Sequence, residues 1–238
     1  AMDPIVNQAA KLHFMYGGAV NGPIVVRGAS GAGTGAAAQH SQSLESWFCH
    51  VPGLKVVTPS NAQNAYDLLL SSFVDANPVI FMEHKLIYKV KENVTLNPIP
   101  KDSSYLGKAS IAQEGTDLTV VSYSNMVNVV KEAVSMDELQ NYSIEIVDLQ
   151  TVSPIDFETI KNSLIKTKKL LVCQEAPSNS SVGTTVVSKV VESDLFNVLE
   201  IAPKLVSGLH SPMPSAKHLE STVIPQKEDI LNAIQDML

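Results

Sequence analysis

The sequence has few cysteines and few basic residues, and each shortage argues against particular classes of protein. Among its 238 residues only Cys49 and Cys173 are cysteines. They lie far apart and without CxxC spacing, which indicates reduced thiols in a reducing compartment. Lys and Arg number 17 against 24 Asp and Glu, so the formal net charge is −7. Because nucleic-acid binding favours a basic face, we expect no nucleic-acid partner.

Long apolar runs are also missing. No run approaches the roughly 18 residues of a membrane span, and the first residues lack a signal-peptide pattern, so we expect no membrane partner. Charged residues make up only 17% of the chain, which fits either a surface partly covered by other subunits or a Ser- and Asn-rich exterior. Four histidines share no metal-ligand spacing that would predict a zinc site, namely His13, His50, His210 and His218.

A glycine-rich stretch from Arg27 to Ser60 organises the first half of the chain. It follows a short apolar run, Pro23–Val26, that predicts a buried strand, and its glycines can adopt backbone angles closed to larger residues. The stretch carries one histidine, His40, ahead of a helix predicted near Leu44–Val51. No Gly-Lys-Ser/Thr and no GxGxxG occurs here, which excludes a Walker loop and a dinucleotide fingerprint. Such a loop is typical of a site in an α/β protein, and a turn with a structural histidine is the alternative.

Apolar periodicity predicts an α/β fold class, with two doubly wound α/β domains. In the first half a helix over 61–73, capped by Ser60, alternates with strands and favours a parallel sheet. The polar segment Lys89–Tyr105 predicts a linker, so we place the distal part of one domain at 1–90, the linker at 91–107 and a second domain at 108–238. The second domain shows no strict alternation, with strands at 117–124, 144–149, 170–173 and near 198–205 and helices at 125–136, 157–165, beyond 183 and at 227–237.

Several segments resemble one family. The runs AAQHSQSLESWF and HVPGLKVV, with DANPVIFMEHKLIY at Asp75–Tyr88 and TDLTVVSYSNMV at Thr116–Val127, are similar to the beta subunit of thiamin-diphosphate-dependent decarboxylase components. These are the first components of 2-oxo acid dehydrogenase complexes and of the related acetoin dehydrogenase. With PIDFETI at Pro154–Ile160, the similarity covers nearly the whole chain. HSQSLESWF and VIFMEHKLIY look closest to the acetoin branch.

This resemblance implies an incomplete thiamin-diphosphate (pyrimidine) binding domain followed by a transketolase C-terminal-like domain. In the family a further segment precedes this point and holds the glutamate that protonates the aminopyrimidine ring, and no residue here takes that role. The family histidine that matches His40 lines the cofactor cleft and interacts with the thiamin-bound intermediate. His40 is therefore the catalytic residue that the resemblance predicts.

The resemblance also implies a structural potassium ion at the end of the helix predicted over 61–73. Its ligands, largely backbone carbonyls, would be Ile24, Ser72, Phe73, Asp75 and Asn77. Unpaired carbonyls at a helix C-terminus carry partial negative charge, which suits a hard cation. An ordinary turn capped by Asp and Asn is the alternative.

The family works as an alpha2-beta2 heterotetramer in which the beta chains form a homodimer and the alpha subunit holds magnesium and the diphosphate. Resemblance implies that a group from acetoin or pyruvate passes to lipoyl on an acyltransferase core, in the bacterial cytoplasm or the mitochondrial matrix. This chain alone is then expected to be inactive. Two alternatives stay open: a non-catalytic assembly or docking module, and a fragment of a transketolase-like single-chain thiamin enzyme.

A few polar residues in both halves stand out. Glu83 and His84 end a predicted strand, and we expect them to form a surface pair rather than a site. Glu175 follows the strand LLVCQ and either faces an interface or is only structural. Gln150 and His210 stand where the family commonly has arginine and aspartate, which leaves partner contacts of the second domain open.

Overall fold

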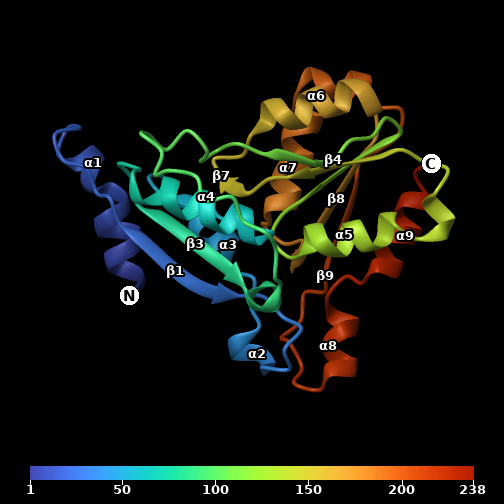
Figure 1. Ribbon diagram of the computed structural model, residues 1–238, viewed down its shortest axis with the longest axis horizontal. Helices are drawn as coiled ribbons and strands as arrows, with labels where there is room; N and C mark the ends of the chain where they lie inside the picture. The colour runs from blue at the N-terminus through green and yellow to red at the C-terminus, as the bar shows by residue number, and fades with distance from the viewer.

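A computed structural model describes residues 1–238 as two α/β units, each built around one sheet (Figure 1). The first sheet has the strand order β1-β3-β2-β7 and the second the order β4-β6-β5-β8-β9. Pairing is parallel except at β7 and β4, which run antiparallel to their neighbours at one edge of each sheet. The strands are β1 (Val25–Ser30), β2 (Lys55–Val57), β3 (Val79–His84), β4 (Ser110–Gln113), β5 (Leu118–Ser122), β6 (Ile144–Asp148), β7 (Thr151–Ser153), β8 (Leu170–Pro177) and β9 (Lys204–Gly208).

The two α/β units match the expected fold class, with mixed rather than purely parallel sheets. The helices are η1 (Pro4–Gln8), η2 (Ala9–Lys11), α1 (Leu12–Met15), α2 (Ala37–His40), α3 (Glu45–Cys49), α4 (Ala62–Phe73), η3 (Lys85–Lys89), α5 (Met126–Val134), η4 (Asp137–Leu139), α6 (Phe157–Thr167), α7 (Val182–Glu192), η5 (Asp194–Val198), α8 (Lys217–Val223) and α9 (Lys227–Gln235). None of them is both long and apolar enough to cross a membrane.

The central strands of the second sheet are buried on both faces, which explains why they are rich in apolar residues. Every residue of β5 and β6 is buried. Val121 and Val147 pack in a cluster with residues of α6 and α7, whereas the neighbouring Val120 and Ile146 pack with residues of α5 and α9. Figure 1 shows these two helix pairs on opposite sides of the sheet. This is the doubly wound arrangement.

The two units share one hydrophobic core. The cluster on the α6 and α7 side continues into the first unit, where Leu54, Val56 and Ile80 belong to it. In addition, β7 lies in sequence between β6 and β8 of the second sheet but pairs with β2 of the first. The division at 91–107 therefore stays a prediction, because the segment beyond it adds a strand to the first sheet.

Several local predictions need correction. The N-cap of α4 is Asn61, whose side chain accepts the backbone N–H of Asn64 at 2.8 Å, and not Ser60. Ser60 instead donates its hydroxyl to the buried carboxylate of Asp148 at 2.5 Å, so it ties the two units together. The strand predicted near 198–205 is also misplaced, because η5 ends at Val198 and β9 begins at Lys204. The sequence did not predict β4, β7 or α8.

Candidate functional site

A cleft of about 810 Å³ opens where the two units meet. One wall is the segment 38–44, which leads from α2 to α3, and the other is the segment 209–213, which follows β9. Figure 1 shows α2 and α8 projecting at the same end of the molecule. Clefts between structural units are where small-molecule sites commonly form, which makes this one the candidate site.

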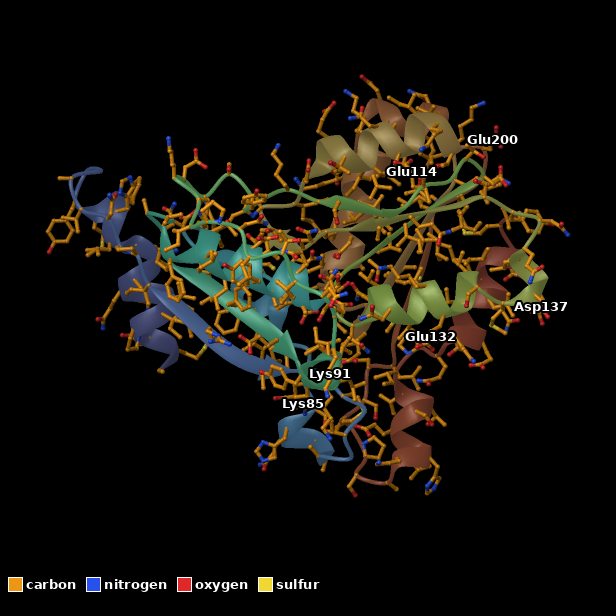
Figure 2. All side chains as sticks on the ribbon, in the orientation of Figure 1. Lys85, Lys91, Glu114, Glu132, Asp137 and Glu200 are labelled. Atoms are coloured by element: carbon orange, nitrogen blue, oxygen red, sulfur yellow. The ribbon has the colours of Figure 1, made fainter.

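His40 is the last residue of α2 and lines this cleft. Its side chain is exposed, and no residue of the chain forms a hydrogen bond to the imidazole. Lys85 follows β3 and donates from Nζ to the backbone carbonyl of His40 (Figure 2 labels Lys85). The backbone of α2 is thereby fixed while the imidazole is free to meet a ligand. The structure places His40 at an opening, and its catalytic role stays a prediction.

Ser41 lies next to His40 and lines the same cleft. The residue is only 3% exposed, and its Oγ has no hydrogen-bond partner within the protein. A buried hydroxyl without a partner costs roughly 1–3 kcal/mol. This hydroxyl is itself buried, so a ligand in the cleft would reach it only after the segment 38–44 moves, and sequence reasoning assigned Ser41 no role in proton transfer.

Glu175, near the end of β8, forms a network between the two units. Its Oε1 accepts from the backbone N–H of Ala32 at 2.9 Å and from Ser43 Oγ at 2.7 Å. Its Oε2 accepts from His84 Nε2 at 2.8 Å, and His84 Nδ1 accepts the N–H of Leu86 at 3.2 Å, which puts the ring proton on Nε2. Burial alone would raise the pKa of Glu175, but the hydrogen bonds from His84, Ser43 and Ala32 outweigh it and lower the pKa.

The prediction that Glu83 and His84 form a surface pair is wrong for His84. That residue is 3% exposed, because it points into the boundary between the two units and meets Glu175 there. Glu83, one residue earlier and on the opposite face of β3, accepts from Arg27 Nε at 2.6 Å and from the Tyr88 hydroxyl at 2.8 Å. The alternation of side chains along a strand separates the two residues.

Glu220 on α8 is a buried carboxylate that sequence reasoning missed. It is 2% exposed, and its two oxygens accept the backbone N–H groups of Gly33 at 2.8 Å and Gly35 at 2.9 Å. The alternating glycines were the only signal, since they indicated a loop whose amides need partners. Nothing in the sequence indicated that the partner is 187 residues away from Gly33.

A second buried carboxylate, Glu45, lies behind the cleft at the start of α3. Its Oε1 accepts from the hydroxyl of Tyr123, which follows β5, at 2.6 Å. Burial raises the pKa of Glu45, with the Tyr123 hydrogen bond acting in the opposite direction. Burial and the nearby Glu45 also raise the pKa of Tyr123 well above its ordinary value. The pair is therefore a neutral tyrosine facing a carboxyl that resists ionisation.

The residues of the predicted potassium site fit a cation only in part. No residue donates to the backbone carbonyls of Ser72 and Phe73 at the end of α4, so both are available. The carbonyl of Ile24 already accepts from Val79 N at 2.8 Å. The carboxylate of Asp75 forms an ion pair with Lys55, which leaves only its backbone carbonyl for a metal. Asn77 donates its side-chain amide to Asp75 Oδ1 at 3.1 Å.

No three side chains among His, Cys, Asp and Glu lie close enough together to hold a metal ion. Carbonyl sites such as the one at the end of α4 are of a different kind. The two cysteines form no disulfide. Burial raises the pKa of Cys49 to about 12 and also raises the pKa of Cys173.

Two known families match this chain. Residues 2–91 match the transketolase pyrimidine binding domain, and residues 107–230 match the transketolase C-terminal domain. Among solved structures, a split-gene transketolase described as an inactive beta4 tetramer superposes with a TM-score of 0.76 at 20% identity. That alignment covers 100% of this chain and 72% of the other, and it shows the fold alone.

Curated relatives share more of the sequence. Pyruvate dehydrogenase E1 component subunit beta of Rickettsia bellii is 38% identical over 239 residues, covering 99% of this chain and 71% of the relative. The human mitochondrial subunit beta is 39% identical over 239 residues, covering 100% and 67%. The mitochondrial subunit beta-1 of Oryza sativa is 40% identical over 236 residues, covering 98% and 62%.

Proposed function

Because this chain belongs to the family of beta subunits of thiamin-diphosphate-dependent 2-oxo acid dehydrogenase E1 components, we propose that its cleft is one half of a thiamin-diphosphate site and that His40 is its catalytic residue. The observation that carries the proposal is the position of His40. The imidazole is exposed on a cleft of about 810 Å³, while its backbone is fixed by Lys85.

The residues of the cleft fit such a ligand. When bound, the cofactor supplies a nucleophilic carbon that attacks the substrate carbonyl. His40 supplies an imidazole that holds or donates a proton at the substrate oxygen near neutral pH. Leu209 and Met213 give the opposite wall apolar side chains for such a ligand to contact.

We propose that the site is completed by an alpha subunit in an alpha2-beta2 heterotetramer, with magnesium and the diphosphate held on alpha and two beta chains in contact. Support comes from the surface of the first unit. Most of the large apolar side chains that remain exposed lie in the first 105 residues, among them Phe14, Trp47 and Phe73. A covering subunit would bury such side chains, and their concentration in this part of the chain supports the proposal. The relatives include bacterial and mitochondrial proteins, which supports the bacterial cytoplasm or the mitochondrial matrix as its location.

The substrate is pyruvate or acetoin in this proposal. Pyruvate loses CO2, or acetoin loses acetaldehyde, and the remaining acetyl group passes to a lipoyl disulfide on an acyltransferase core. The disulfide is the two-electron oxidant in either case, and one of its sulfurs leaves as a thiol. The names of the relatives favour pyruvate.

The experiment is reconstitution with the cognate alpha subunit, thiamin diphosphate and magnesium. Turnover is followed by reduction of an artificial electron acceptor, with pyruvate and acetoin compared. We expect activity with one of them in the mixture and none with the chain alone. A fully active chain without alpha, or a mixture that binds but turns over neither substrate, would refute the proposal. The second result would favour a non-catalytic docking module.

We also propose that a potassium ion binds the free carbonyls at the end of α4, together with those of Ile24, Asp75 and Asn77. The support is the pair of carbonyls of Ser72 and Phe73 that have no donor. A ligand that binds only the folded state raises the melting temperature. Thermal unfolding in potassium chloride should therefore occur at a higher temperature than in tetramethylammonium chloride of equal ionic strength, and equal midpoints would exclude the site.

A further inference from the structure

We propose that two carboxylates of the second unit, Glu175 and Glu220, are positioning residues that hold the loop carrying His40 in its working place. The second unit would thus act directly on the site. The catalytic consequence rests on the role proposed above for His40. The structural part, that these carboxylates hold the loop, stands independently of that role.

The contacts of Glu220 are the strongest element. A single buried carboxylate accepts two backbone amides, of Gly33 and Gly35, at 2.8 and 2.9 Å. Hydrogen bonds to an ionised acceptor are about twice as strong as neutral ones. Losing the acceptor leaves the amides of Gly33 and Gly35 without a partner in the protein, because both donate to this carboxylate alone.

Glu175 holds the same segment at both ends. Ala32 N–H, at the start, and Ser43 Oγ, at the end, both donate to Oε1 of Glu175. In addition, Gly31 N–H donates to the carbonyl of Gln42 at 3.1 Å, which closes the segment into a loop. His40 lies inside this closed segment. A shift of the points that Glu175 holds would therefore displace His40 relative to the cleft.

The two carboxylates act together with the contact of Lys85 to the carbonyl of His40, while the glycines of the loop add no side-chain packing of their own. Gly31, Gly33 and Gly35 have φ angles of +86°, +89° and +71°. This left-handed backbone favours glycine, which has no side chain to pack. Alternating left-handed residues can direct successive amide groups to one side, a concave arrangement that binds anions. Here the anions are carboxylates of the protein itself. Segments with few apolar contacts open at low free-energy cost unless polar contacts hold them.

Glu220→Gln tests the inference, because it keeps the shape of the side chain and replaces one of its two acceptor oxygens with an amide donor. Glu132→Gln is the matched control: Glu132 is exposed on α5, and no hydrogen bond to its carboxylate is present (Figure 2). Amide hydrogen exchange of the full chain is measured by NMR at Gly33 and Gly35 and, for comparison, at Val120 and Ile146 in the core.

We expect exchange at Gly33 and Gly35 to become about tenfold faster or more in Glu220→Gln, with core amides and the control unchanged. Unchanged exchange in the loop would overturn the inference. Equal acceleration at Val120 and Ile146 would also overturn it, because the carboxylate would then stabilise the whole molecule rather than place the loop. If Glu220→Gln does not fold, Ser43→Ala removes one donor to Glu175 without changing charge, and the same comparison applies at Ala32.

The second measurement uses the variant reconstituted with the alpha subunit. Misplacing a catalytic group lowers kcat and leaves KM nearly unchanged when ground-state binding is intact. We expect kcat to fall by roughly tenfold in Glu220→Gln and not in Glu132→Gln. Faster loop exchange with unchanged kcat would refute the positioning role. A wild-type assembly without activity would instead refute the proposed function, while the exchange data would still decide whether the carboxylates hold the loop.

Discussion

His40 contributes little to the folded structure, because its imidazole is exposed and no group of the chain forms a hydrogen bond to it. A side chain of this kind can be removed at small cost in stability, within about 0.5 kcal/mol for a surface position. This makes His40 a favourable residue for separating chemistry from folding.

We predict that His40→Ala lowers kcat of the assembly reconstituted with alpha by about 10²–10⁴-fold, the usual contribution of a general acid or base. The melting temperature should stay that of the wild type. His50→Ala is the control, since His50 is exposed beyond the end of α3 and lies outside the cleft. Equal activity of the His40 and His50 variants would remove His40 from the mechanism.

Asp148, at the end of β6, is a buried carboxyl that makes the stability of the protein depend on pH. It accepts from Ser60 Oγ at 2.5 Å and from Asn64 Nδ2 at 3.0 Å, so it joins the two units. Burial raises its pKa to about 6, although these hydrogen bonds and that of the Gln150 N–H act to lower it. The folded state therefore holds this proton at pH values where the unfolded chain has released it.

We predict that Asp148 lowers stability as pH rises from about 4 to about 6, since the folded state then binds more protons than the unfolded state. The contribution of Asp148 to the free energy of unfolding is complete at pH values below the unfolded pKa. It is lost as the pH rises through the folded pKa, which lowers the free energy of unfolding by about 3 kcal/mol. Asp148→Asn should remove this part of the pH dependence. Urea unfolding across that pH range measures it, with the exposed Asp137→Asn as control. Parallel pH profiles for wild type and Asp148→Asn would contradict the prediction.

At the scale of elements, the turn after β1 depends on glycine at one position above others. Gly31 has φ +86°, and a Cβ there would lie 2.0 Å from Nε2 of His84. His84 cannot move away without breaking its contact with Glu175. The end of β1, the end of β3 and the end of β8 thus meet at a point with no room for a methyl group.

We predict that Gly31→Ala destabilises the protein by roughly 2–5 kcal/mol, combining the left-handed backbone with overpacking. Gly28→Ala is the matched control in β1, where nothing lies within 4 Å of the added Cβ and φ is not positive. Chemical unfolding of the two variants provides the comparison. A Gly31→Ala protein as stable as Gly28→Ala would show that the loop has another conformation in solution.

The elements that the sequence predicted well are those with a strong local signal. β3 ends at His84, where the sequence predicted that a strand ends, and five of its six residues are buried. β7 and α8 were missed because they are short and form through tertiary contacts, β7 by pairing with β2 and α8 by placing Glu220 on the glycine loop.

The same distinction applies to the site. His40 was identified through the family resemblance, and the structure places it on the cleft. The loop around it was predicted, but not what holds it. Glu175 and Glu220 are 143 and 187 residues from the amides of Ala32 and Gly33, and no local pattern connects residues so far apart. The sequence cannot show that these carboxylates are buried, because the backbone N–H groups that donate to them come from a distant part of the chain.

The two units are joined by many contacts around the cleft. They share a hydrophobic cluster, β7 pairs across the boundary, and Glu175, Glu220 and Asp148 form hydrogen bonds with groups of the first unit. The open side of the cleft and the exposed apolar side chains of the first unit are the features that support the proposed alpha partner.

Calorimetric titration of thiamin diphosphate with magnesium tests most directly whether this cleft is half of a shared site. The ligand is titrated into the chain alone, into the cognate alpha subunit alone and into their mixture. We predict full-affinity binding only in the mixture, with none to the chain alone. Equal binding to this chain without alpha, or no binding to an assembled mixture, would contradict it.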